Sequence, residues 1–102
     1  MGTIYRRVNP TLASISTTKL LSITTAETLL ILGSASTAFE INNLGAYTVY
    51  YGDSGVLTNS GGIISSNGAK FWDHVAGGFR VYLAVITGGV TSRVIVHEYE
   101  GQ

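Results

Sequence analysis

Apolar and polar residues alternate along much of the chain, with the two-residue period that is typical of β-strands. In Phe79–Val85 every second residue is apolar, and in Ser92–Tyr99 one face carries Val94, Val96 and Glu98. A glycine-rich segment lies between these two runs, and its composition is typical of a hairpin turn. The pattern therefore predicts two strands joined as a hairpin near the C-terminus.

Similar runs rich in Val, Ile, Thr and Tyr recur between clusters of Gly, Asn, Asp and Ser, which is the pattern of an all-β sandwich or barrel. Residues 20–32 also fit an amphipathic helix, but their threonines and isoleucines favour two strands about Thr25-Ala26-Glu27. The predicted strands are Thr3–Val8, Lys19–Thr24, Thr28–Leu32, Ala38–Asn42, Tyr47–Gly52, Gly62–Ser65, Lys70–Asp73, Phe79–Ile86 and Ser92–Tyr99. We expect an all-β fold, a single antiparallel β-sandwich of jelly-roll type with about eight strands.

The length of 102 residues fits one domain. Asn9-Pro10 interrupts the first strand-like run, because proline fixes its φ angle and lacks an N–H for the ladder. We therefore divide the chain into an N-terminal arm, residues 1–10, and a β-sandwich domain, residues 11–102.

Charge and cysteine content narrow the classes of function. Six Lys and Arg balance six Asp and Glu, so the net charge is zero and the basic footprint of nucleic-acid binding is missing. Without cysteine, disulfides and thiol catalysis are excluded. The longest uninterrupted apolar run, Leu29–Leu32, is far shorter than the ~20 residues of a membrane helix. We expect partners other than nucleic acid and membranes.

Candidate catalytic and metal-binding residues are few. His74 and His97 lie in different predicted elements and show no zinc-ligand spacing. Asp73 and His74 are adjacent, and adjacent residues of a strand point to opposite faces, so they would cooperate only across a bulge. Asp53 lies in a glycine-rich turn, where aspartate commonly binds backbone amides. We expect no enzyme activity, no catalytic residue, no metal and no cofactor.

Aromatic residues offer a binding alternative. The rings could form a stacking platform for a sugar, or they could fill the core of the sandwich. Tyr50 and Tyr51 are adjacent on a predicted strand, so at least one of their rings should be exposed or lie at an interface. The aromatic residues considered are Tyr47, Tyr50, Tyr51, Phe71, Trp72, Phe79 and Tyr82.

The composition also predicts self-association. Edge strands are commonly protected by lysine or proline, but this chain has two lysines and one proline for all its edges. The arm is apolar and β-prone, so we expect it to lie against a neighbouring subunit, with Arg6 and Arg7 paired to carboxylates there. The candidate interface residues are Ile4, Tyr5, Arg6, Arg7, Tyr50, Tyr51 and Trp72.

The stretch from Ser22 to Glu100 resembles a small β-sandwich architecture of tailed-phage and prophage virion proteins. The resemblance covers about three-quarters of the chain, and turn chemistry carries most of it. Ser65-Ser66-Asn67-Gly68 stands where a Pro-Gly-like turn is usual, and the arm lies outside the pattern. The matching segments are Phe39–Gly45, Thr48–Asp53, Val56–Ile64, Phe79–Ala84 and Arg93–Tyr99.

This resemblance implies a non-enzymatic structural protein of the capsid decoration (cement), head-fibre or tail accessory type, often a homotrimer. It implies a virion location after synthesis in the host cytoplasm, and a major capsid or tail protein as partner. The capsid is then a second surface, besides a neighbouring subunit, against which we expect the arm to lie. The alternative is a carbohydrate-binding or adhesin-like module that uses exposed aromatic residues.

Overall fold

The computed structural model describes residues 14–55 and 61–100, which form eight strands and no helix. The predicted arm, its strand Thr3–Val8 and the boundary at residue 10 lie outside the described residues. The eight strands are β1 (Ser14–Ile23), β2 (Thr28–Ile31), β3 (Ala38–Asn43), β4 (Val49–Gly52), β5 (Gly62–Ile64), β6 (Ala69–Trp72), β7 (Arg80–Ala84) and β8 (Ser92–Glu100).

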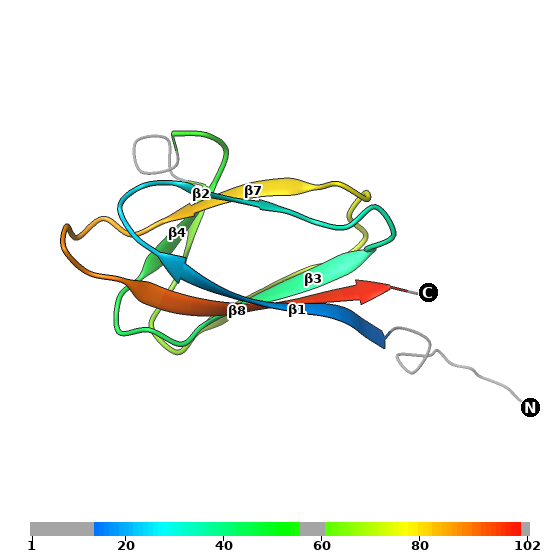
Figure 1. The fold of residues 1–102 in the computed structure, drawn as a ribbon, viewed down its shortest axis with the longest axis horizontal. Helices are drawn as coiled ribbons and strands as arrows, with labels where there is room; N and C mark the ends of the chain where they lie inside the picture. Colours follow the sequence, from blue (N-terminus) through cyan, green and yellow to red (C-terminus); the bar gives the residue numbers. More distant parts are fainter. Residues whose placement is uncertain (1–13, 56–60, 101–102) are drawn as a thin grey trace, which may run out of the picture.

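Two antiparallel sheets of four strands lie face to face (Figure 1). Sheet A has the order β1-β8-β3-β6 and sheet B the order β2-β7-β4-β5. The pairs β1–β8, β2–β7, β3–β6 and β4–β5 are nested, so the chain folds like one long hairpin rolled into two layers. This order is that of a jelly roll, which confirms the predicted fold class.

Alternation along the strands places the core between the sheets. In β8 the side chains of Val94, Val96 and Glu98 are buried, while the residues between them are partly or fully exposed. In β7 the inward residues Val81 and Leu83 meet the same core. The core is completed by Ile23, Leu30, Leu32, Phe39, Ile41, Val49, Ile64 and Val85.

The predicted C-terminal hairpin is wrong. β7 pairs with β2 and β4 in sheet B, whereas β8 pairs with β1 and β3 in sheet A. The glycine-rich segment between them therefore crosses from one sheet to the other. Alternation shows which face of a strand points inward, but it does not show which strand lies beside it. Two strands with apolar inward faces can pack across the core from opposite sheets as well as pair within one sheet. The helical alternative for residues 20–32 is excluded too, because β1 and β2 occupy most of that segment.

Different contacts close the two sides of the sandwich. On the side of β4 and β6, Trp72 stacks on Phe39 with ring centroids 4.4 Å apart and meets the Tyr51 ring edge-on at 5.0 Å. On the side of β1 and β2, polar atoms join the sheets. This second closure leads to the candidate site.

Candidate functional site

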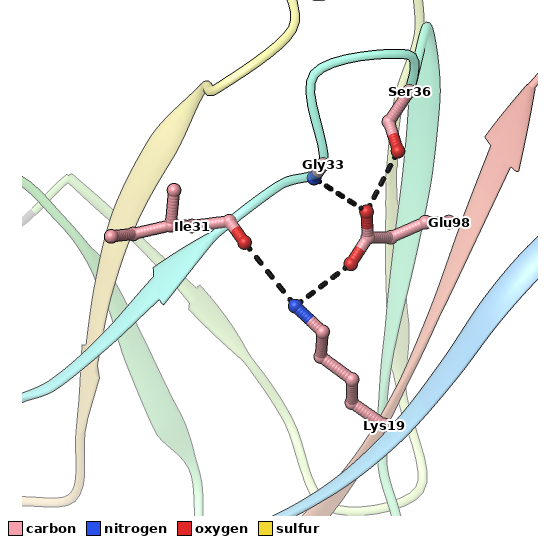
Figure 2. Close-up of polar contacts among 5 residues, drawn as sticks. All are labelled: Lys19, Ile31, Gly33, Ser36 and Glu98. Carbon is pink, nitrogen blue, oxygen red and sulfur yellow. Dashed lines mark hydrogen bonds and ion pairs between the residues drawn. The ribbon is translucent and has the colours of Figure 1, made fainter.

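A buried carboxylate forms the centre of the polar closure, shown in Figure 2. Glu98 lies on β8 at an inward position, and only 1% of its surface is exposed. Its Oε1 accepts hydrogen bonds from the Gly33 backbone N–H (2.9 Å) and the Ser36 hydroxyl (2.7 Å). Its Oε2 pairs with Lys19 Nζ at 3.0 Å. We call Lys19, Ile31, Gly33, Ser36 and Glu98 the Glu98 cluster.

Lys19 connects the cluster to both sheets. It points inward from β1, the edge strand of sheet A, and its Nζ also donates to the Ile31 carbonyl oxygen of β2 at 3.2 Å. Leu32 N donates to Phe79 O, so alternation turns the Ile31 carbonyl toward the free edge of sheet B. One ammonium group therefore neutralises a carboxylate of sheet A and satisfies an edge carbonyl of sheet B.

The ionisation of Glu98 follows from these contacts. Burial raises the pKa of the carboxyl group, but the hydrogen bonds from Gly33, Ser36 and Lys19 and the charge of Lys19 lower it more. The net pKa of Glu98 lies below its ordinary value of 4.5, so the group is charged at neutral pH. With both oxygens engaged and almost no exposed surface, the carboxylate is suited to hold the sheets together.

A second buried polar group lies at the opposite end of β8. The Asn43 side-chain amide donates to the carbonyl oxygens of Tyr47 (2.7 Å) and Ile64 (3.0 Å). Its Oδ1 accepts from the Gly45 N–H (3.0 Å) and from the Ser92 hydroxyl (2.8 Å). All hydrogen-bonding positions of the amide are thus filled. This Asn43 cluster joins β3 and β8 of sheet A to β5 of sheet B.

The alternation of apolar and polar residues carries a signal for the Glu98 cluster. Glu98 shares a face with Val94 and Val96, and a carboxylate on an otherwise apolar strand face must find buried partners. Lys19 alternates in the same way with Leu21 and Ile23, which share its face of the strand. The partners Gly33 and Ser36 could not be identified, because they lie in a connection whose path depends on the sheet order.

The outer face of sheet A is a further candidate site because it exposes large apolar side chains. Register places Ile15 beside Tyr99, and Leu20 beside Ile95. Phe71 of the edge strand β6 contacts the Tyr99 ring edge-on, with centroids 5.9 Å apart. Leu20 is 55% exposed and Phe71 49%. We call Ile15, Leu20, Phe71, Ile95 and Tyr99 face A; its polar neighbours are Thr18, Glu40, Asn42, Arg93 and His97.

The outer face of sheet B also has exposed apolar residues, but its own chain covers part of it. Ala84 pairs with Tyr50 on the outward side, yet it is 0% exposed. The Gly55 N–H, after β4, donates to the Glu27 carboxylate before β2, and β7 lies between these two strands. Figure 1 shows the segment after β4 rising over this part of sheet B. Leu29, Ile31 and Ile63 lie outside the covered area and are exposed.

The three predicted interface residues that the structure describes, Tyr50, Tyr51 and Trp72, do not lie on one surface. Tyr51 and Trp72 are half-buried and pack against each other and the core. Tyr50 is half-buried on the outward side of sheet B, beside Ile63. Ile4, Tyr5, Arg6 and Arg7 lie outside the described residues. Of the aromatic residues considered for sugar binding, Phe71 and Tyr47 are exposed and the others are half-buried.

The histidines take separate positions. His97 lies on the outward side of β8, with its Nδ1 3.2 Å from the Thr18 hydroxyl. His74 has a left-handed backbone with a φ of 56°, and its Nδ1 lies 3.5 Å from Asp73 Oδ2. The two neighbours thus meet because His74 belongs to a turn and not to a strand. The side chains of His74 and Asp73 are exposed, and so is that of Asp53.

Among the described residues no three His, Asp or Glu side chains gather as a metal site. These residues also contain no candidate membrane-spanning helix. No protein-family model matches the chain, and no curated protein or solved structure matches it significantly.

Proposed function

We propose that this protein is a non-enzymatic structural component of a virion, of the capsid decoration or head and tail accessory type, which binds the particle surface as an oligomer. Its strand order supports the proposal, because double-sheet jelly rolls recur in viral capsid domains. Fold alone does not define function, and the surface supplies the second support. The described outer faces expose apolar side chains, which suit binding to another protein through shape and apolar contacts.

The observation that carries the proposal is the combination of this fold with two internal clusters of polar groups that are fully engaged. The Glu98 and Asn43 clusters use their polar atoms to join the sheets. These polar groups therefore hold the two sheets rigidly together, as a component of a particle requires. The exposed apolar residues provide the contact surface.

Particles from the strain that encodes the chain provide the test. We expect the protein to co-sediment with density-gradient particles, and particles lacking its gene to lose a surface feature in negative-stain images. A protein found only in the particle-free fraction would contradict the proposal. Particle binding that free sugars abolish would instead favour the carbohydrate-binding alternative.

A further inference from the structure

We infer that face A is the surface through which copies of this chain associate. This inference deepens the self-association in the proposed function and names its contact surface. The row Leu20–Ile95 and the group Ile15–Tyr99–Phe71 run over β1, β8 and β6. A sheet that faces water usually presents polar residues outward. Apolar residues on three of the four strands of sheet A depart from that pattern.

The edges of sheet A indicate how a second copy can approach. The two lysines of the chain lie on its two edge strands, Lys19 on β1 and Lys70 on β6. Charged residues on edge strands, inward-pointing ones above all, oppose edge-to-edge pairing. Lys19 is such an inward charge. Sheet A is thus protected against extension by another strand, while its face is left open to packing.

The size of the face fits a stable contact between folded subunits. Strands about 4.8 Å apart and about 3.4 Å per residue give the 29 residues of β1, β3, β6 and β8 a flat area of roughly 470 Å². Because side chains make the surface uneven, the accessible surface area of the face is larger than this flat area and approaches the ~800 Å² per partner of a standard interface. The longest strand of sheet B has five residues, whereas β8 of sheet A has nine. The outer face of sheet B is therefore about half as long as face A, and part of it is covered by the same chain.

The charges on and around face A favour a second copy as the occupant. Arg93 and Glu40 lie among its apolar residues, so each copy offers one group of each sign to the other. The net charge of the chain is zero, and two copies therefore approach without net repulsion. A strongly acidic or basic partner would find no matching field on this face.

Light scattering on the full chain at about 50 μM tests the inference with matched variants. We expect an oligomeric mass for the unmodified protein and a monomeric mass for Leu20→Glu. The control Ile63→Glu places the same charge on the outer face of sheet B, at a residue that is 57% exposed against 55% for Leu20, and it should keep the oligomer. Phe71→Glu, on the opposite edge of face A, should act like Leu20→Glu. Circular dichroism and melting curves establish that each variant is folded.

A monomeric mass for the unmodified protein, or an oligomer that persists in folded Leu20→Glu and Phe71→Glu, would overturn the inference. Equal dissociation by Ile63→Glu would also overturn it. Particle binding is measured separately, so an oligomer that depends on face A but does not bind particles contradicts the virion proposal and leaves this inference intact.

Discussion

In the Glu98 cluster, hydrogen bonds and an ion pair offset the free-energy cost of burying a charged carboxylate. The carboxylate is held by the Gly33 N–H, the Ser36 hydroxyl and Lys19. Replacing Glu98 by Gln keeps the shape but removes the charge that Lys19 neutralises. Because Lys19 is partly exposed and can turn to water, we expect a loss of about 1–3 kcal/mol in the free energy of unfolding. Urea denaturation at pH 7 measures it.

The same variant makes a prediction about pH. The folded-state pKa of Glu98 is lowered, so its charge stabilises the fold above the ordinary value of 4.5, and this contribution is lost as pH falls through the folded pKa. The stability difference between the unmodified protein and Glu98→Gln should therefore be largest near neutral pH and shrink below pH 4.5. A difference that stays constant from neutral to acid pH would show that the charge contributes nothing.

Gly45 is required by the Asn43 cluster for a steric reason. A Cβ at this position would lie 2.0 Å from Ser92 Oγ and 2.8 Å from Ser92 Cα, and the backbone there cannot move aside. We expect Gly45→Ala to lower the free energy of unfolding by about 1–3 kcal/mol. Gly88→Ala is the matched control, because its added Cβ meets nothing within 4 Å. Equal melting temperatures for the two variants would contradict this account.

At the scale of the strands, β6 separates an inward from an outward aromatic residue. Trp72 stacks on Phe39 and meets Tyr51, whereas the adjacent Phe71 points outward and is half-exposed. Trp72→Ala should cost about 2–4 kcal/mol, because it opens the aromatic side of the sandwich. Phe71→Ala should cost well under half of that. Thermal unfolding of variants kept at low concentration, where association through face A is weak, compares the two.

The strands themselves could largely be predicted from the sequence, but their pairing could not. Alternation depends on residues two apart, and it gave the inward side of β8 with Val94 and Val96. Pairing depends on residues far apart, such as Thr18 and His97, which are 79 positions apart. The expected hairpin of β7 and β8 failed for this reason. The Glu98 cluster was missed likewise, since Gly33 approaches Glu98 only after the sheets have packed.

At the scale of the whole molecule, the two polar clusters and the aromatic stack act together. The Glu98 cluster and the Asn43 cluster lie at opposite ends of β8, and the Trp72 stack closes the side away from β1. Packing of apolar side chains is tolerant of small shifts, but buried hydrogen bonds are directional. The clusters thus fix one relative position of the two sheets.

The nested order of the strands has a consequence for biosynthesis. Of the eight described strands β8 is translated last, yet it lies inside sheet A between β1 and β3. Until β8 has left the ribosome, β1 lacks the one neighbour that it has among the described strands of sheet A, and Lys19 lacks the carboxylate of Glu98. Nascent chains stalled before Ser92 should therefore remain sensitive to protease, and resistance should appear once Glu100 has left the exit tunnel. The order of the strands thus makes the completion of sheet A wait for β8.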